Sequence, residues 1–185
     1  MQWRKHSELE DKHAFLGASK YAWLNYDKDK TIEAFENHLA KERGTRLHAF
    51  AAEAINLGIM AMQNNDTINI YINDCIANNM SPEVTLYFSD NCFGTADAIS
   101  FENNKLKIFD LKTGKGKTKF DQLEIYAALF CLEYELYPER IQMELRIYQN
   151  NTFRKEEPTP ERINYIIESI IEKDRILNEY WEELR

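Results

Sequence analysis

Apolar side chains recur at helical spacing through the N-terminal half of the chain. Their intervals of three and four predict a helix over 31–42, which Gly44 should end. Thr45 is then placed to cap a second helix that runs to about Ala61. The other helices predicted here are a short one capped by Ser19 and one over 66–77.

From residue 83 onward the apolar period becomes that of β-strands. Alternation over 83–89 predicts a first strand, and GTADAISF and LKIFDLK predict a second and a third. The intervening SDNCFG and ENNK segments have the composition of tight turns. Short turns of this kind join neighbouring strands, so we expect an antiparallel meander.

The last third of the chain returns to helical spacing, interrupted by one strand. After the loop KTGKGKTK we expect a helix over 120–135 and a strand over 143–149. Because a helix precedes that strand, a crossover should place it beside the third strand. The segment NNTFRKEEP is expected to be a loop, and Thr159 should cap a long final helix with Pro160 at its first position.

This order of elements predicts a single α/β domain over 1–185. Its centre is a mixed β-sheet of about four strands, an antiparallel meander plus one strand after a crossover helix, flanked by helices. The N-terminal helices occupy 19–79, the core 83–149 and the C-terminal helix 159–184.

Composition is that of a soluble globular protein, with 44% hydrophobic and 29% charged residues. The N-terminal sequence MQWRKHSELEDKH lacks the apolar region of a signal peptide, and no apolar run approaches the roughly 20 residues of a membrane span. We therefore expect a cytoplasmic protein. The three scattered cysteines exclude a disulfide framework and a cysteine-only metal site within the chain.

The net charge of −8 is unusual for a protein that binds nucleic acid. Its distribution is uneven, because KTGKGKTK carries four lysines and no acid while acidic residues crowd both chain ends. Lys115 and Lys117 in this loop are candidate substrate-binding residues. An acidic body with one basic loop fits local phosphate capture and argues against a wide non-specific DNA-binding face.

Three ionisable residues fall on the predicted hairpin of the second and third strands. Asp110 and Lys112 are two positions apart and so share a face. If the turn closes at Asn103 and Asn104, residue numbers of paired positions sum to about 207, which places Asp97 opposite Asp110 with Cβ atoms about 5 Å apart. Two such carboxylates favour a bound Mg²⁺ or Mn²⁺. A structural ion pair at a sheet edge is the alternative interpretation of Asp110 and Lys112.

Two helices supply further polar candidates. Gln122 and Tyr126 lie four positions apart beside the core stripe of their helix, whose start favours anions. Tyr126 can equally be a core residue. His48 lies beside a stripe of small residues that allows close approach to a neighbour. It becomes a candidate ligand only if its helix packs against the face of Asp97 and Asp110, and is otherwise an ordinary polar residue.

The motifs GTRLHAFAAEA, GTAD, FDLKTGKG and QLEIYA follow one another in this order. Each is weak alone, but together they resemble the PD-(D/E)XK nuclease superfamily, in its RecB-like exonuclease branch. That branch is marked by an upstream His, an Asp, D/E-x-K and Q-x-x-x-Y. The segment GASKYAWL is similar to small phage-borne members, so the resemblance covers roughly 19–149. It implies a restriction-endonuclease-like core.

The resemblance also implies roles for individual residues. His48, Asp97, Asp110 and the backbone carbonyl of Leu111 would bind Mg²⁺ or Mn²⁺. Lys112 would be the catalytic lysine, acting with the carboxylates Asp97 and Asp110. The second carboxylate is Asp where Glu is commoner, which shortens the ligand by one methylene.

The remaining implications concern the substrate and further ligands. Gln122 and Tyr126 would position the DNA strand or support the site. Glu83 is a loose match for a second-metal ligand, and a solvated strand end is the favoured interpretation. The cysteine quartet that holds an iron–sulfur cluster in some relatives is missing, so no such cluster is expected.

The resulting hypothesis is a metal-dependent DNA nuclease, with exonuclease action in phage or bacterial recombination, replication or repair. Its partner is DNA, in the cytoplasm of a bacterium or a phage-infected host, with no membrane. One alternative is a catalytically weak DNA- or protein-binding module on the same fold, which the net charge and the acidic final helix favour through a protein partner or a homo-oligomer. The other alternative is a restriction-type endonuclease.

Overall fold

The computed structural model describes residues 4–9 and 13–184. The chain forms two compact units, Met1–Thr45 and Arg46–Arg185. All the residues proposed above for metal binding, catalysis and substrate binding belong to the second unit. Among the described residues, no helix combines the length and the apolar character that a membrane span requires.

The described residues of the first unit form two 3₁₀ helices and the beginning of a long α-helix, α1. These are η1 (Ser7–Leu9), η2 (Ala18–Asn25) and α1 (Lys28–Asn56). Ser19 lies inside η2, whose N-cap is Gly17, so the prediction that Ser19 caps this helix was wrong. The side chain of Trp23 stabilises the start of η2 instead, because its indole Nε1 donates a hydrogen bond to the Gly17 carbonyl at 3.1 Å.

Helix α1 continues past Gly44, so the predicted break between two helices was wrong. A glycine inside a helix costs only about 1 kcal/mol relative to alanine, and the good helix formers Arg43 and Arg46 lie close to this one. Thr45 does not act as a cap, because its hydroxyl donates to the Lys41 carbonyl one turn back at 3.2 Å. The helix ends at Asn56, earlier than expected, and Gly58 follows with φ of 66°.

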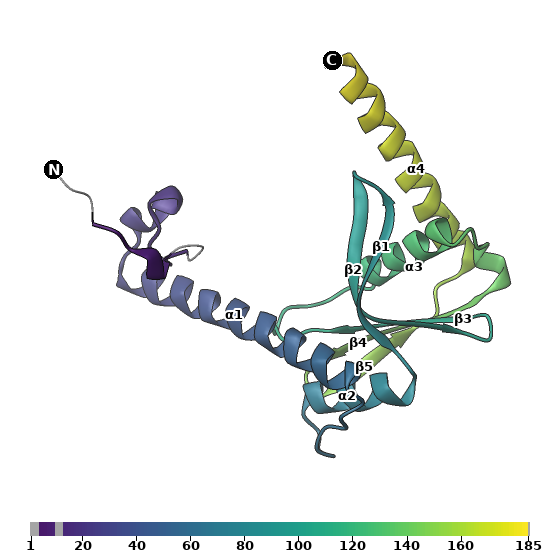
Figure 1. The fold of residues 1–185 in the computed structure, drawn as a ribbon, viewed down its shortest axis with the longest axis horizontal. Helices are drawn as coiled ribbons and strands as arrows, with labels where there is room; N and C mark the ends of the chain where they lie inside the picture. The colour runs from purple at the N-terminus through teal and green to yellow at the C-terminus, as the bar shows by residue number, and fades with distance from the viewer. Residues whose placement is uncertain (1–3, 10–12, 185) are drawn as a thin grey trace. The chain divides into compact units, whose positions relative to one another are not determined.

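The second unit is built on one five-stranded sheet in the order β1-β2-β3-β4-β5 (Figure 1). The strands are β1 (Ser81–Ser89), β2 (Cys92–Glu102), β3 (Lys105–Leu111), β4 (Gln142–Gln149) and β5 (Thr152–Glu156). Strands β3 and β4 are parallel, and the other neighbours are antiparallel. The predicted α/β class, the mixed sheet and the crossover beside the third strand are confirmed.

The fifth strand corrects the prediction of a loop over NNTFRKEEP. Asn150 and Asn151 adopt φ of 53° and 61°, and form the turn of a hairpin between β4 and β5. Asparagine tolerates this left-handed backbone, which two-residue hairpin turns require. Phe153 on β5 packs against Tyr148, with ring centroids 5.3 Å apart.

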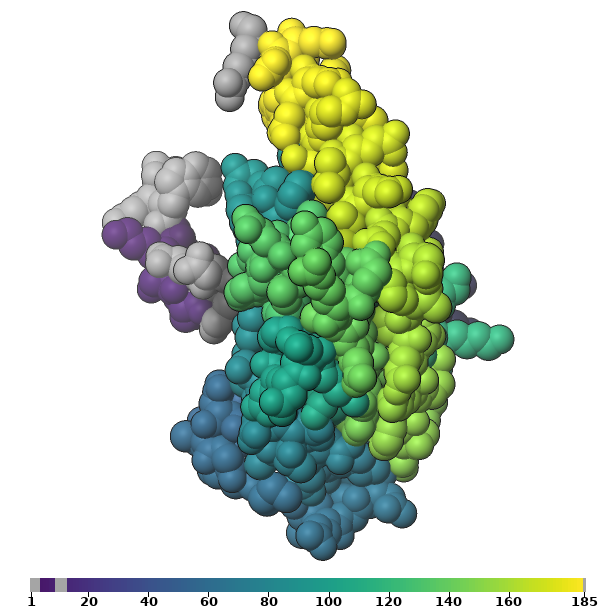
Figure 2. Space-filling view, turned by 90° about the vertical axis from the view of Figure 1, so that its right-hand side faces the viewer, coloured from purple at the N-terminus to yellow at the C-terminus, as the bar shows by residue number. Residues whose placement is uncertain are grey.

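Helices cover both faces of the sheet. On one face lie α3 (Asp121–Glu133) and α4 (Pro160–Glu183), which share a large apolar cluster with the strands. Figure 2 shows α4 running alongside α3 on this side. The end of α1 and α2 (Thr67–Ala77) pack on the other face with a second apolar cluster. Thr159 caps α4 as predicted, accepting a hydrogen bond from the Arg162 amide.

The sheet opens between β2 and β3, and this opening positions the candidate site. The two strands pair as far as Ala98 and Phe109, and then β1 and β2 bend away as a two-stranded ribbon (Figure 1). The bend shows in the packing, because Ala96 belongs to the cluster on the α3 face and Ala98 to the cluster on the α2 face. Residues at this bend therefore lie at the edge of both layers.

Candidate metal centre

Three potential ligands from three elements meet at the bend of the ribbon. His48 comes from α1, Glu83 from β1 and Asp97 from β2, and one ligand atom of each lies within 4.8 Å of the other two. The small residue Ala51, one turn after His48, is buried against the sheet and brings this part of α1 close to it. The condition under which His48 becomes a candidate ligand, that its helix packs beside Asp97, is therefore met.

Asp97 is the centre of this group. Its Oδ2 lies 3.4 Å from Nδ1 of His48 and accepts a hydrogen bond from the Leu111 amide at 2.9 Å. The side chain thus occupies the gap where the backbone pairing of β2 with β3 has ended. The hydrogen bond to Asp97 raises the pKa of His48, and the charges of Asp110 and Glu83 add to the effect.

Asp110, one step beyond the last β2–β3 pair, is a buried carboxylate beside this group: its charge acts on His48, although it is not one of the three residues whose ligand atoms lie within 4.8 Å of one another. It is only 2% exposed, and its Oδ1 accepts from Nζ of Lys112 at 2.9 Å. Its Oδ2 is buried and has no hydrogen-bond partner. Burial raises the pKa of this carboxyl, and the nearby charge of Asp97 raises it further. A buried oxygen without a partner is costly, and a cation would remove that cost.

Glu83 was given a minor role by the sequence, but it belongs to the central group. Val84 pairs with Ala96, and this register places Glu83 opposite Asp97. Its backbone is left-handed, with φ of 52° in the middle of a strand. Such a conformation costs on the order of 1–3 kcal/mol for a residue other than glycine, and it is typical of functional sites. Burial raises the pKa of Glu83, as does the charge of Asp97.

A β-bulge explains why the position of Glu83 opposite Asp97 could not be predicted from the sequence. Ser89 pairs with Cys92 but Tyr87 pairs with Phe93, so β1 contains one extra residue near the turn. Without that residue Val84, not Glu83, would face Asp97. No pattern in the segment SPEVTLYFSDN marks the extra residue.

A hydrogen-bonded chain leads from Asp110 to α3. Nζ of Lys112 also donates to Oε1 of Gln122 at 2.9 Å, and Nε2 of Gln122 donates to the Tyr126 hydroxyl at 3.0 Å. The structure therefore brings together all four residues that the sequence placed on two different elements. It holds the ammonium of Lys112 beside a buried carboxylate.

Gly94 on β2 makes room for the end of this chain. A Cβ at this position would lie 2.9 Å from Cε1 of the Tyr126 ring. The glycine of GTAD thus allows α3 to approach the ribbon closely enough for Tyr126 to reach Gln122.

The remaining predicted residues lie at the margin of the site. Leu111 is buried, and its amide is held by Asp97. Lys115 and Lys117 are exposed in the loop between β3 and α3. That loop is anchored to β4, because Nε2 of Gln149 donates to the carbonyls of Gly114 and Gly116 at 2.5 and 2.9 Å.

The donor set fits a divalent cation that prefers oxygen ligands. Carboxylates from Glu83, Asp97 and Asp110 with one imidazole suit Mg²⁺ or, because of the histidine, Mn²⁺. The orphaned Oδ2 of Asp110 is the observation that favours a cation most directly.

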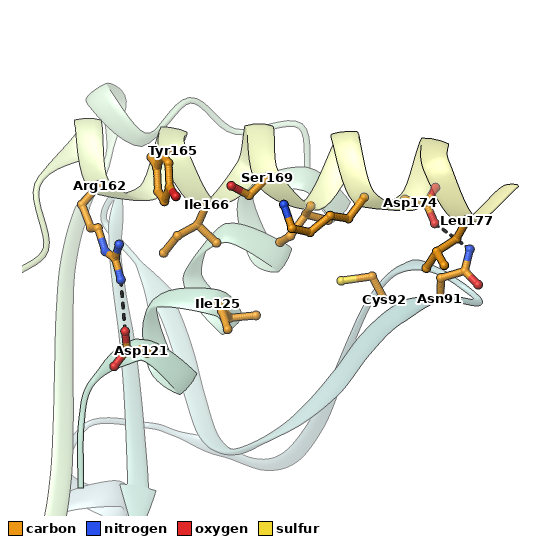
Figure 3. Close-up of a pocket in the computed structure, with 12 residues that line it drawn as sticks. Asn91, Cys92, Asp121, Ile125, Arg162, Tyr165, Ile166, Ser169, Asp174 and Leu177 are labelled. Carbon is orange, nitrogen blue, oxygen red and sulfur yellow. Dashed lines mark hydrogen bonds and ion pairs between the residues drawn. The ribbon is translucent and has the colours of Figure 1, made fainter. Parts of the chain in front are cut away.

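A pocket of about 430 Å³ lies elsewhere, between α3, α4 and the tip of the ribbon (Figure 3). Apolar side chains such as Ile125, Ile166 and Leu177 line it, and the ion pair of Asp121 with Arg162 closes one end. None of the residues discussed above as metal ligands or as partners of Lys112 lines this pocket.

No protein-family model, curated protein or solved structure matches this chain. The site is therefore interpreted from its own geometry and from the motifs that compose it.

Proposed function

We propose that the chain is a Mg²⁺- or Mn²⁺-dependent DNA nuclease with a restriction-endonuclease-like core, a PD-(D/E)XK enzyme of the RecB-like exonuclease branch. The observation that carries the proposal is the pairing of two features at one opening of the sheet. One is the group of His48, Glu83 and Asp97 with the unpartnered oxygen of Asp110. The other is Lys112, held beside it by Asp110 and Gln122.

In this proposal His48, Asp97 and Asp110 hold the cation, with the Leu111 carbonyl, and Glu83 adds a fourth side chain. A divalent ion in such a site supplies positive charge to a phosphoryl oxygen and lowers the pKa of a water molecule. In the protein alone one oxygen of Asp110 has no hydrogen-bond partner, and a cation bound here would satisfy it.

Lys112 supplies a fixed positive charge to the reaction. Its two hydrogen bonds, to Asp110 and Gln122, fix the ammonium before substrate arrives. A preorganised cation stabilises the negative charge that develops on a phosphate during hydrolysis. Tyr126 acts through Gln122. Its hydroxyl accepts a hydrogen bond from Nε2 of that amide, which orients the amide so that Oε1 faces Lys112.

The setting follows from the motifs. Exonuclease action on DNA ends, in phage or bacterial recombination, replication or repair, is the proposed role, in the cytoplasm of the bacterium or infected cell. DNA is the proposed partner, and the acidic surface leaves room for a protein partner or a homo-oligomer.

Hydrolysis of linear DNA in the presence of Mn²⁺ tests the proposal. Wild-type protein should degrade it, and Lys112→Ala should lose at least about a hundredfold in rate, the usual cost of removing one preorganised charge donor. Lys173→Ala, on an exposed part of α4, is the matched control and should keep full activity. Progressive loss from the ends supports an exonuclease, whereas discrete bands from circular plasmid would indicate an endonuclease. Absence of hydrolysis on linear, circular and single-stranded DNA would overturn the proposal.

A further inference from the structure

The β1–β2 ribbon carries a row of exposed cross-strand pairs. Beyond the Glu83 and Asp97 position, the register continues with Thr85 opposite Thr95 and then Tyr87 opposite Phe93. These four side chains are exposed, while the alternate residues such as Leu86 and Ala96 are buried against the α3 face. The row therefore forms the outer face of the ribbon.

The two pairs differ in chemistry but are both ordered. The Thr85 and Thr95 hydroxyl oxygens lie 3.0 Å apart and share a hydrogen bond. The rings of Tyr87 and Phe93 are stacked, with centroids 6.4 Å apart and planes 26° apart. The Tyr87 hydroxyl donates to Oδ1 of Asp90 at 3.0 Å, which fixes the orientation of that ring.

Both rings of the aromatic pair are exposed. Tyr87 is 47% and Phe93 is 61% exposed, so the hydrophobic surface of both rings meets solvent. Aromatic side chains held rigidly at a surface are typical of recognition sites, because a ring presents a large apolar area at little entropic cost. The Thr85–Thr95 pair lies between these rings and the acidic residues Glu83 and Asp97. Such an open surface favours a flat ligand that stacks on the rings over a ligand that needs a deep apolar pocket.

The row leads to the candidate metal centre. Phe93 precedes Asp97 by four residues on the same strand, a path of about 13–14 Å at the usual rise per residue. Stacked nucleotides advance by about 3.4 Å each. The aromatic pair thus lies a few nucleotides from the place where a phosphate would be cut.

We propose that this face of the ribbon binds single-stranded DNA, with unpaired bases stacked on Tyr87 and Phe93 and the strand passing the threonine pair to the metal centre. The inference rests on the proposed function, and it names the substrate class of that same site. Stacking needs the face of an unpaired base, which a duplex hides, and it is tolerant of sequence. Stacking also suits an acidic protein, since it gives affinity without a broad basic surface.

Binding and hydrolysis are measured separately to test this. Binding of a fluorescent oligothymidylate is followed by anisotropy in a Lys112→Ala background with Mn²⁺, so that the strand is not cut. Adding Tyr87→Ala and Phe93→Ala should weaken binding by at least about tenfold, as expected for the loss of base stacking. Tyr137→Ala removes a comparably exposed ring, next to the Gln142 end of β4, and should leave binding unchanged.

Hydrolysis of bis(p-nitrophenyl) phosphate, which is too small to reach the aromatic pair from the metal centre, separates the two proposals. With Lys112 intact, Tyr87→Ala/Phe93→Ala should cut this diester at the wild-type rate but degrade single-stranded DNA more slowly. Tyr87→Trp, which keeps a ring, should retain DNA degradation. If the wild type cuts neither substrate, the proposed function fails. If it cuts both, and the double variant binds and degrades single-stranded DNA like the wild type, the aromatic pair serves another partner and this inference is overturned.

Discussion

At Asp110, the surrounding protein disfavours the ionised form of the carboxylate. Its Oδ2 has no partner, and burial together with the charge of Asp97 raises its pKa. Because the charged form is disfavoured relative to water, the ionised group lowers stability at neutral pH. Residues of this kind trade stability for function.

The substitution Asp110→Asn should therefore separate stability from activity. In the presence of a chelator we expect its free energy of unfolding at pH 7 to exceed that of the wild type by about 0.5–1 kcal/mol, measured by urea denaturation. Addition of Mn²⁺ should raise the melting temperature of the wild type but not of the variant. Asp121→Asn, at an exposed position on α3, is the control and should keep the Mn²⁺ response. A variant that is destabilised in chelator would contradict this account of Asp110.

Gly94 tests the geometry of the chain from Tyr126 to Lys112. In Gly94→Ala the new methyl group would lie 2.9 Å from the Tyr126 ring, so the ring must move away from Gln122. We expect overpacking to lower the free energy of unfolding by about 1–3 kcal/mol. Hydrolysis of DNA should be at least about tenfold slower, because Gln122 loses the hydroxyl that orients it and Lys112 is then held less well.

The control for this substitution is Gly116→Ala. A Cβ at Gly116 meets no atom within 4 Å, so stability and hydrolysis should stay near wild type. If Gly94→Ala retains full activity while its stability falls, the contact positions the helix but not Lys112.

At the level of elements, the sequence predicted correctly the helices and strands that are marked by apolar periodicity and bounded by turn residues. Helix α3, the three strands of the meander and the parallel neighbour β4 followed from alternation and from a crossover. The turn at Asn103 and Asn104 predicted the β2–β3 register, whose pairs sum to 207 as in Ala98 with Phe109. The same Asn-Asn signal at 150–151 also marks a hairpin, and using it would have found β5.

Elsewhere local signals competed with tertiary structure. Gly44 is a helix breaker by composition, but the cost of one glycine is small beside the hydrogen bonds of a helix of 29 residues. Glu83 enters the site only because a bulge shifts β1 by one residue and a left-handed backbone turns the chain. Neither the bulge nor the left-handed backbone changes the spacing of apolar residues along the sequence. The sequence therefore could not show that Glu83 belongs to the main group of candidate ligands.

An ionic network centred on the buried Glu144 links β3, β4 and β5, through Lys105, Arg146 and Lys155, on the side of the sheet that α2 covers. Glu144, 3% exposed, accepts hydrogen bonds from Lys105 at 2.6 Å and from Nε of Arg146 at 2.7 Å, and Arg146 also contacts Asp74 on α2 at 3.1 Å. Burial alone would raise the pKa of Glu144, but these hydrogen bonds and charges lower it from 4.5 to about 2. The network therefore stabilises the fold only while Glu144 is ionised.

The lowered pKa fixes the pH range over which this stabilisation is lost. It is fully present above the ordinary pKa of 4.5 and disappears as the pH falls toward about 2. Glu144→Gln should lower the free energy of unfolding by about 1–3 kcal/mol at pH 7, and urea denaturation should show the difference from wild type shrinking between pH 5 and pH 3. Glu157→Gln, an exposed partner of Lys155, should cost less than about 0.5 kcal/mol. A difference for Glu144→Gln that is constant with pH would contradict this assignment.

At the scale of the whole molecule, the charge distribution predicts weak dependence of DNA binding on salt. The protein carries a net charge of −8, and its lysine-rich loop offers only four cations near the candidate site, including Lys112. For single strands each neutralised phosphate contributes about −0.7 to the slope of log K against log salt, so the slope should be no steeper than about −3.

Removing two of these lysines checks the assignment of the loop. Lys115→Ala/Lys117→Ala should flatten the slope by about 1.4, measured by anisotropy over a range of salt concentrations. Lys173→Ala should leave it unchanged. A slope much steeper than about −3, the value for four phosphate contacts, would indicate an extended basic face. The charge distribution argues against such a face.

The binding of a divalent ion by His48, Asp97 and their neighbours is the central claim, and anomalous scattering from crystals grown with Mn²⁺ tests it most directly. We expect a strong peak bonded by His48 and Asp97 together with the free oxygen of Asp110, with Glu83 as a further ligand, and no such peak in crystals of Asp97→Ala. A wild-type crystal in which Mn²⁺ binds only at other positions, while these side chains keep the arrangement described above, would contradict the metal centre and the nuclease activity proposed for it.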